Sequence, residues 1–425
     1  MITPHQKLGF GIGMLDWQER INLERMRRER PDKVRAQLKE EGFAAIILGI
    51  GDNRVYATAI DPGVLSGSIP SGSGHSILFT EYPEDTIDYT LEANCTKQAR
   101  IHSTWIKSEN IRTALTLNAH QVEAQIVEHA KRNAANIFQD LKEKGIEKER
   151  IAYDGLAPAL LNALENTGLN LTATPKLMVD VRATKTKDEI NCLKIAGYIA
   201  NQGFWELYKH IRPGATECEV SSYAAAAFMK AGNRHSFMVN LRSGPNSAPN
   251  WLSHSPTDRM MQPGDLIICD MIGPLFLGYR VCYYRTFKCG LKPTQKEKDM
   301  YKRVYEWQYA AMEAIKPGVF TSEIAEKWPP ASTWGYKEEW ECWSNELGHG
   351  IGLSQYEPPL IGRAFWPQTI EKGMTFSLET WDGEDGVGGC RIENVVVVND
   401  TGCENLYTWP DEEIVVPEHS LLIGV

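Results

Sequence analysis

The sequence lacks the features of a membrane protein, a nucleic-acid-binding protein and a disulfide-stapled protein. No run approaches the roughly 18 apolar residues that a bilayer-spanning helix needs. Acidic side chains outnumber basic ones by 55 to 45, so there is no basic excess to attract nucleic acid. The nine cysteines form no CxxC pair and no zinc-finger spacing, which favours reduced, buried thiols. These absences predict a soluble, cytoplasmic protein that binds a small molecule and neither nucleic acid nor a membrane.

The length and the element pattern predict two domains. The chain has 425 residues, of which 42% are hydrophobic, and single cores rarely grow past about 250–300 residues. Residues 18–42 have the pattern of a charged amphipathic helix, followed by an apolar strand at 43–48. Further elements are expected as follows: a turn at 49–53, strands at 76–80, 151–154 and 177–181, and a helix at 120–144. Thr186 and Glu189 have the spacing of a helix capping box, so we place the boundary just before them, between an α/β domain at 1–180 and a second domain at 181–425.

The second domain contains an internal repeat. In residues 264–270 and 373–379 a glycine opens an apolar segment and a carboxylate follows six residues later. Pro-Gly pairs at 213–214 and 317–318 precede the two copies, and the offsets of 104 and 109 residues nearly agree. The remaining pattern predicts helices near 188–211, 217–231, 294–315 and 321–328, and strands within 236–290 and 374–398. A repeat that presents one acid per half predicts an α+β domain with a shared central site.

Four residues of this domain have the chemistry of a metal site. His349 lies between glycines, and Glu393 precedes the apolar strand at 395–398. Asp270 and Glu379 end the two repeated segments. A bare carboxylate beside a buried strand is costly, so these acids must be paired, coordinated or exposed. The set of three carboxylates and one imidazole predicts a site for Mn, Fe, Co or Zn.

Together these segments resemble the creatinase/prolidase/methionine aminopeptidase superfamily, which has the pita-bread fold. The resemblance covers roughly residues 180–410, and it includes Arg285-Thr286-Phe287 and the Gly-His-Gly-Ile-Gly segment around His349. It implies a carboxyl-terminal domain of two pseudo-symmetric halves, with a smaller α/β amino-terminal domain. It also implies a homodimer and a hydrolase related to aminopeptidase P.

Two positions depart from the peptidase pattern of this superfamily. The family's dinuclear site uses a second aspartate three residues before the arginine of Arg-Thr-Phe, and Cys282 stands there. A thiolate can bind zinc or iron but cannot bridge two hard ions as a carboxylate does, so one divalent ion is expected rather than two. Cys282 is either a fifth candidate ligand or a small buried residue. Tyr356 stands where the peptidase branches carry a second histidine, which weakens the case for peptide hydrolysis.

A histidine ahead of the first acidic strand offers acid–base chemistry. His254 lies in a segment that resembles the one holding the proton-transferring histidine of creatinase, with a one-residue difference in spacing. Creatinase itself needs no metal, so a metal-free site is an alternative. The candidate catalytic residues are therefore His254, Glu379, Glu393 and Tyr356. Six tryptophans could also form an aromatic wall for a methylated cation, or simply pack in the core: Trp328, Trp334, Trp340, Trp343, Trp366 and Trp381.

The function expected first is a creatinase- or prolidase-like hydrolase that cleaves a C–N bond in a small polar substrate. Three alternatives stay open at this point. An Xaa-Pro peptidase accounts for the ligands that remain. A lyase that eliminates a sulfonium or ammonium group is suggested by the spacing from Asp270 to Arg285, which equals that of a pita-bread dimethylsulfoniopropionate lyase. The third alternative is a non-catalytic pita-bread domain that binds peptides or proteins.

Overall fold

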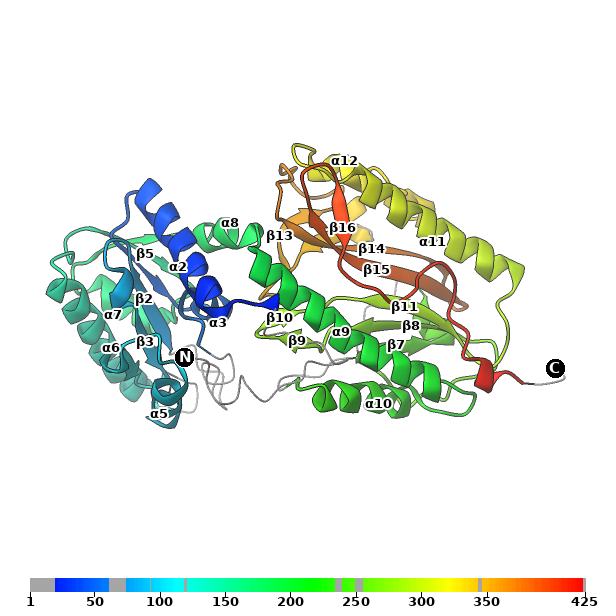
Figure 1. The fold of residues 1–425 in the computed structure, drawn as a ribbon, viewed down its shortest axis with the longest axis horizontal. Helices are drawn as coiled ribbons and strands as arrows, with labels where there is room; N and C mark the ends of the chain where they lie inside the picture. Colours follow the sequence, from blue (N-terminus) through cyan, green and yellow to red (C-terminus); the bar gives the residue numbers. More distant parts are fainter. Residues whose placement is uncertain are drawn as a thin grey trace. The chain divides into compact units, whose positions relative to one another are not determined.

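The computed structural model describes residues 20–60, 74–91, 93–117, 121–233, 239–248, 255–342 and 346–422. The chain forms two compact units that meet in the sequence between Arg182 and Ala183 (Figure 1). His254 and Trp343, which carried predictions, lie outside the described residues. Among the helices described, none is long and apolar enough to cross a bilayer.

The first unit is built on a six-stranded mixed sheet in the order β4-β3-β2-β1-β5-β6. Its strands are β1 (Ala45–Leu48), β2 (His75–Phe79), β3 (Ile87–Thr90), β4 (Ile111–Thr113), β5 (Arg150–Asp154) and β6 (Asn170–Ala173). Strands β1 and β5 run parallel, whereas β1 and β2 run antiparallel. Strand β1 is buried along its whole length, which explains its continuous apolar sequence.

In the described part of the chain, the helices that accompany this sheet are α2 (Leu23–Glu40), α3 (Gly51–Thr58), α5 (Ala93–His102), α6 (Glu123–Glu143), α7 (Pro158–Glu165) and α8 (Leu177–Ala183). Helix α6 buries Ala130, Ala134, Ile137 and Leu141, a helical spacing that gives it one apolar face. Two sequence predictions were wrong here. Residues 51–53, which were expected in a turn, form the first part of helix α3. Residues 177–181, which were expected to be a strand, lie in helix α8. The periodicity of a short apolar run does not distinguish a helix from a strand, so the tertiary structure decides which of the two forms.

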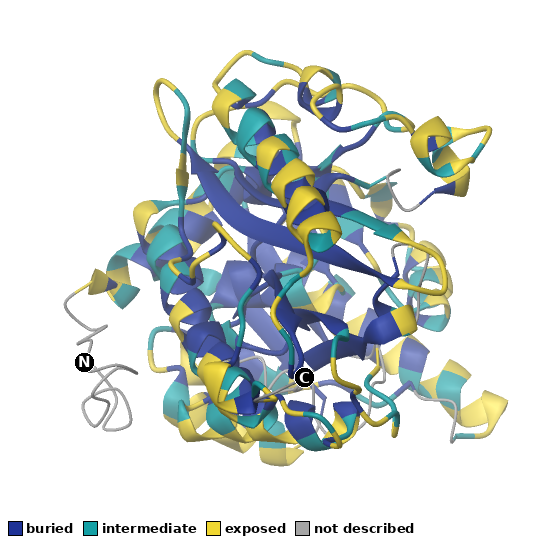
Figure 2. Ribbon diagram, turned by 90° about the vertical axis from the view of Figure 1, so that its right-hand side faces the viewer, coloured by how far each residue is buried: buried dark blue, intermediate teal, exposed yellow. Residues whose placement is uncertain are grey.

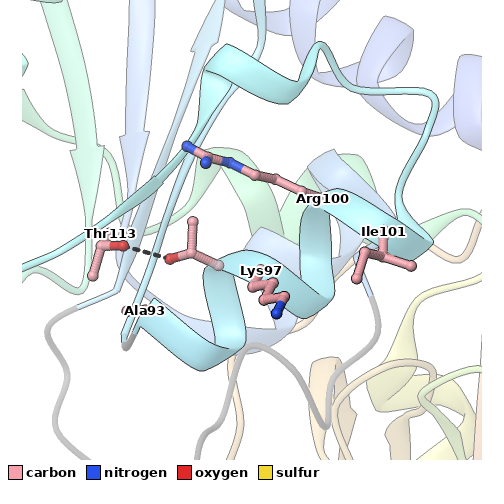
Figure 3. A pocket seen from close by; sticks show the side chains of 6 residues that line it. Ala93, Lys97, Arg100, Ile101 and Thr113 are labelled. Carbon is pink, nitrogen blue, oxygen red and sulfur yellow. Dashed lines mark hydrogen bonds between the residues drawn. The ribbon is translucent and has the colours of Figure 1, made fainter.

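A surface pocket of the first unit lies beside α5 (Figure 3). Its lining residues are Ala93, Thr96, Lys97, Arg100, Ile101 and Thr113. The Thr96 and Thr113 hydroxyls are 2.6 Å apart, and Nε of Arg100 donates to the carbonyl of Ile111 at 2.8 Å. None of the lining residues is an acid, a histidine or a cysteine, so the pocket lacks the chemistry that the sequence placed in the second unit.

The second unit contains two main antiparallel sheets, in the orders β11-β8-β7 and β13-β12-β14-β15-β16. The strands are β7 (Val239–Ser243), β8 (Leu266–Met271), β11 (Tyr284–Lys288), β12 (Gly348–Gly350), β13 (Glu357–Ile361), β14 (Thr375–Glu384), β15 (Gly388–Val398) and β16 (Cys403–Asn405), with a small hairpin of β9 (Leu275–Phe276) and β10 (Tyr279–Arg280). Its helices are α9 (Lys187–His210), α10 (Glu217–Lys230), α11 (Gln295–Ala314) and α12 (Thr321–Ala325). Strands β7, β8, β11, β12 and β15 are buried throughout, whereas the long helices expose one face (Figure 2). The expected capping box at Thr186 and Glu189 is confirmed at the start of α9.

The repeat seen in the sequence is also a repeat of hydrogen bonds. The amide of Gly214 donates to the carbonyl of Met261, and that of Gly318 donates to the carbonyl of Ile370, both at 2.9 Å. The amide of Gly264 likewise donates to the carbonyl of Cys289 at 2.7 Å, as that of Gly373 does to Val398 at 2.9 Å. All four glycines have φ between 84° and 93°, a conformation that other residues rarely adopt. The α+β class with two pseudo-symmetric halves is therefore confirmed.

Arg285 and Thr286 join the two sheets of the second unit, where β11 lies beside β15 (Figure 1). The buried guanidinium of Arg285 donates to the carbonyls of Glu393 and Trp409 at 2.8 Å and of Pro410 at 3.0 Å. The hydroxyl of Thr286 donates to the carbonyl of Arg391 and accepts from its amide, both at 2.8 Å. These bonds take the place of an unbroken strand ladder between the halves.

Replacing Arg285 by methionine should destabilise the second unit by about 3 kcal/mol or more, because several buried carbonyls lose their donor. The matched surface change Lys372→Met removes an exposed ion pair with Asp400 and should cost less than about 1 kcal/mol. Urea unfolding followed by tryptophan fluorescence would measure both. Equal losses in the two variants would contradict this role for Arg285.

Candidate metal centre

The four ligands predicted from the sequence lie on four different strands and are all buried. Asp270 is on β8, His349 on β12, Glu379 on β14 and Glu393 on β15, with exposed fractions of 3%, 0%, 2% and 0%. Glu379 and Glu393 are directly opposed partners across the β14–β15 ladder, so their side chains share one face of the sheet. His349 is paired with Ser377, two residues before Glu379, and so it lies on that face as well.

The flanking glycines let the strands approach His349 closely. A Cβ on Gly348 would lie 2.7 Å from the carbonyl oxygen of Ser377, and one on Gly350 would lie 2.6 Å from that of Glu357. Nδ1 of His349 is 2.9 Å from the carbonyl oxygen of Gly350, which holds the proton on Nδ1. Nε2 is left to face the acids, 3.4 Å from Oε1 of Glu379 and 4.0 Å from Oε1 of Glu393.

The structure gathers the candidate ligands into two groups that share His349. In one, Cys282, His349 and Glu393 place ligand atoms within 4.8 Å of one another; in the other, Glu346, His349 and Glu379 do so. Asp270 belongs to neither group within the described residues. It is held instead by the amide of Tyr283 at 3.1 Å and by Nδ2 of Asn240 at 3.3 Å.

One arginine compensates part of the negative charge. Arg391, two residues before Glu393, forms a close ion pair with Oε2 of Glu379, and its guanidinium lies 3.9 Å from the centre of the Tyr284 ring. Burial alone would raise the pKa of Glu379, but Arg391 and His349 outweigh it and the pKa lies below its usual value. Glu379 is therefore the acid of the cluster that is ionised most readily.

The other three acids of the cluster have no such cation beside them among the described residues, and burial raises the pKa of each. Burial raises the pKa of Asp270 to about 7, despite the amide of Tyr283, and raises that of Glu346 to about 7. The pKa of Glu393 lies well above its ordinary value, first because of burial and then because Glu379 and Asp270 are near. The hydroxyl of Ser377 donates to Oε1 of Glu393 at 2.5 Å. Without a further cation, the cluster retains protons at neutral pH.

The donor set fits a divalent metal ion. Nε2 of His349 and Oε2 of Glu393 are buried and have no hydrogen-bond partner among the described residues. Buried polar atoms of this kind normally have a partner, and a cation would supply one to both. An ion would also offset the charge that Arg391 leaves uncompensated. Oxygen and imidazole nitrogen ligands suit Mn, Fe, Co and Zn, as the sequence predicted.

Tyr356 lies at the mouth of this cluster. Its ring centre is 4.3 Å from that of His349, and the side chain is 50% exposed. The next residue, Glu357, is fixed by a buried ion pair in which Nζ of Lys185 is 2.9 Å from Oε2. Among the predicted catalytic residues that the structure describes, Tyr356 is therefore the one that is open to solvent.

The tryptophans do not form one wall in the part of the chain that the structure describes. Trp334 and Trp381 are in contact, with ring centres 4.2 Å apart, and Nε1 of Trp334 donates to Asp382 at 3.3 Å. Trp328 packs in the hydrophobic core, whereas the exposed fractions of Trp340 and Trp366 are 69% and 89%. Trp334 and Trp381 belong to a hydrophobic core cluster with Ala331 and Cys342, so the described tryptophans do not support an aromatic wall around a substrate.

Comparisons with known proteins agree with this fold. Residues 191–400 match the model of Metallopeptidase family M24. The Xaa-Pro dipeptidase of Bacillus anthracis has a similar structure, with a TM-score of 0.71 and 25% identity over 91% of this chain and 99% of that one. This family match and the shared fold both point to the creatinase/prolidase/methionine aminopeptidase superfamily. The chain's resemblance to this superfamily, expected from the motifs, is thereby confirmed.

Two curated members of the superfamily are similar in sequence to part of this chain. The probable dipeptidase PepE of Mycobacterium tuberculosis is 32% identical over 252 residues, and the Xaa-Pro dipeptidase of Pyrococcus furiosus is 31% identical over 232 residues. These matches cover 58% and 53% of this chain, and they span 65% and 64% of the relatives' own lengths.

Sequence reasoning missed two residues of the cluster. Glu346 lies three residues before His349, and Arg391 lies two residues before Glu393. Neither residue lies in the repeated segments or between glycines, which were the sequence features that indicated the other site residues. The alternation of β15 was the available signal for Arg391, because residues two apart in a strand share a face.

The buried charge of Glu393 should make the chelated protein less stable as the pH rises. The carboxyl of the unfolded chain ionises near about pH 4.3, whereas the folded one keeps its proton to a higher pH, so stability falls over that window. The advantage in Tm of Glu393→Gln over the unsubstituted protein should therefore grow from about pH 5 to about pH 8. The exposed change Glu384→Gln serves as the control, and an advantage of Glu393→Gln that shrank with pH would contradict the prediction.

Proposed function

We propose that this protein is a metal-dependent hydrolase that cleaves the C–N bond of short peptides, with Xaa-Pro dipeptides as the first substrates to test. The observation that carries the proposal is the buried group of His349, Glu379 and Glu393, in which Nε2 of His349 and Oε2 of Glu393 lack partners. The match to the metallopeptidase family supports the reaction class, and the names of the two similar dipeptidases support the substrate class.

The chain's own residues would divide the work of hydrolysis. His349 and Glu393 would hold one divalent ion, and Glu379, which pairs with Arg391, would lie beside it. Such an ion polarises a carbonyl and lowers the pKa of water. Glu346 holds its proton more tightly than an ordinary carboxyl does, so it could return a proton to the leaving nitrogen. Arg391 keeps Glu379 ionised and oriented. Tyr356 would border the substrate as it enters.

A second candidate is a creatinase-like reaction on the C–N bond of a small non-peptide substrate. Cys282 and Tyr356 favour it, because they stand where the peptidase pattern has an aspartate and a histidine. In this reaction His254 would move the proton, a role that stays a prediction. The lyase and the non-catalytic binding domain gain no specific support from the described residues. A homodimer also stays a prediction.

The direct test is release of amino acids from a panel of Xaa-Pro and other dipeptides, with guanidino and N-methyl compounds in parallel, by protein loaded separately with Mn, Co or Zn. We expect hydrolysis of dipeptides. Substituting His349→Ala or Glu379→Gln should lower kcat/KM by roughly 100-fold or more, because both residues face the reacting group.

The control for this test is Glu404→Gln, on the exposed part of β16, which should leave kcat/KM unchanged. Turnover of the guanidino or N-methyl compounds alone would favour the creatinase-like candidate. Dipeptide hydrolysis that persists after chelation and in His349→Ala would overturn the proposal.

A further inference from the structure

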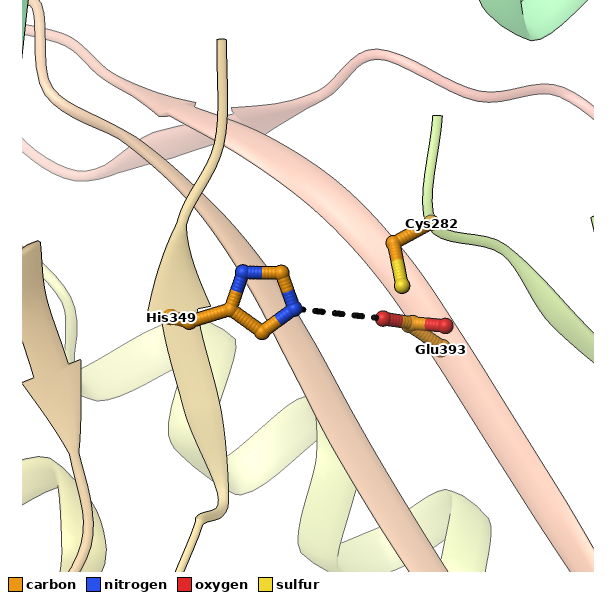
Figure 4. Close-up of side chains that lie close together, drawn as sticks. All are labelled: Cys282, His349 and Glu393. Carbon is orange, nitrogen blue, oxygen red and sulfur yellow. Dashed lines mark ion pairs between the residues drawn. The ribbon is translucent and has the colours of Figure 1, made fainter. Parts of the chain in front are cut away.

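Cys282 faces the same space as the unpartnered atoms of His349 and Glu393 (Figure 4). The three side chains come from separate segments: the loop before β11, strand β12 and strand β15. Their exposed fractions are 2%, 0% and 0%. The thiol, the imidazole Nε2 and the carboxylate lie within 4.8 Å of one another. This arrangement is a buried triad of one sulfur, one nitrogen and one oxygen donor.

The loop that carries Cys282 is fixed rather than loosely placed. Nε2 of Gln355 donates to the carbonyl of Val281 at 2.9 Å, and the amide of Tyr283 donates to Asp270 at 3.1 Å. Cys282 therefore lies between two residues whose backbones are anchored. A thiol held in this way points into the cluster as a permanent part of it.

The distances in the triad suit one shared ion. Zinc lies about 2.0–2.1 Å from imidazole nitrogen, about 2.0–2.2 Å from carboxylate oxygen and about 2.3 Å from thiolate sulfur. In tetrahedral coordination two such ligands therefore lie about 3.3–3.6 Å apart. Nε2 of His349 and Oε1 of Glu393 are 4.0 Å apart, and all three donors lie within 4.8 Å of one another. Movements of roughly half an ångström to one ångström would bring the three donors to one ion.

The triad with Cys282 is a better site than the competing group with Glu346. Nε2 of His349 can bind only one ion, so the two groups exclude each other. In the Glu346 group, Glu379 is already engaged by Arg391. In the Cys282 group, Oε2 of Glu393 is buried and has no partner among the described residues. A cation is stabilised more by the carboxylate of Glu393, which has this unpartnered oxygen, than by that of Glu379, which is already paired with Arg391.

We infer that Cys282 is a thiolate ligand, so that the centre holds one ion between Cys282, His349 and Glu393 and prefers Zn²⁺, Co²⁺ or Fe²⁺ to Mn²⁺ and Mg²⁺. The inference rests on the metal dependence in the proposed function and specifies its ligands. The S–H bond breaks as the sulfur–metal bond forms, and the proton passes to solvent. Thiolate is a soft ligand, which accounts for the selectivity. A set of three protein ligands is typical of catalytic zinc sites rather than structural ones.

Titration of the metal-free protein with Co²⁺ tests this directly. We expect a near-ultraviolet thiolate-to-cobalt charge-transfer band that saturates at one ion per chain. Cys282→Ser should lose the band and weaken Co²⁺ and Zn²⁺ binding by about 100-fold or more, since even partners outside the ligand set contribute roughly 10–100-fold. The matched control is Cys390→Ser, because Cys390 is also buried and lies on β15 three residues from Glu393. This variant should keep the charge-transfer band and the affinity for Co²⁺ and Zn²⁺.

A second variant keeps the test decisive if Cys282→Ser does not fold. Cys282→Asp restores a carboxylate, so it should bind metal without the charge-transfer band. Co²⁺ binding without the band in the unsubstituted protein, weakened by Glu346→Gln but not by Cys282→Ser, would overturn the inference and leave the hydrolase proposal standing. Absence of any Co²⁺ binding would also overturn it. A charge-transfer band in a protein that cleaves no dipeptide would uphold the thiolate ligand while the proposed function fails.

Discussion

Four carboxyl groups, one thiol and one imidazole share a buried space in which Arg391 is the compensating cation of the described cluster. The excess of acids there works against the folded state of the metal-free protein, since burial favours their neutral forms. The surrounding fold must therefore hold these groups against their mutual repulsion. It does so with backbone and hydroxyl donors, such as the amide of Tyr283 on Asp270 and the hydroxyl of Ser377 on Glu393.

The repeated architecture supplies the rigidity that this cluster requires. Each half carries an acid on a strand, near the end of β8 and in the middle of β14, and each half starts that strand from a left-handed glycine with the same hydrogen bonds. Arg285 then fixes one half to the other through carbonyls close to Glu393. The acids are thus positioned by sheet register and not by their own interactions, which is how groups that repel each other remain close.

Within this frame, Cys282 and Tyr356 set the chain apart from the peptidase pattern. A thiol in place of a carboxylate removes a bridge between hard ions and adds a soft donor. A half-exposed tyrosine in place of a histidine changes the group that a substrate meets first. Both changes alter chemistry without altering the scaffold, which agrees with a superfamily whose fold hosts many reactions.

The sequence by itself determined the α+β class, the duplicated second domain, the capping box at Thr186 and the residue types of the site, because these depend on periodicity and short motifs. It failed at residues 49–53 and 177–181, where short apolar or glycine-rich runs suit more than one state. Only the tertiary structure decided that Asp270 belongs to neither group of candidate ligands, while Cys282 and Glu346 each belong to one and Arg391 pairs with Glu379. Distances between side chains depend on strand register and loop path, which join residues more than 100 positions apart and leave no local trace in the sequence.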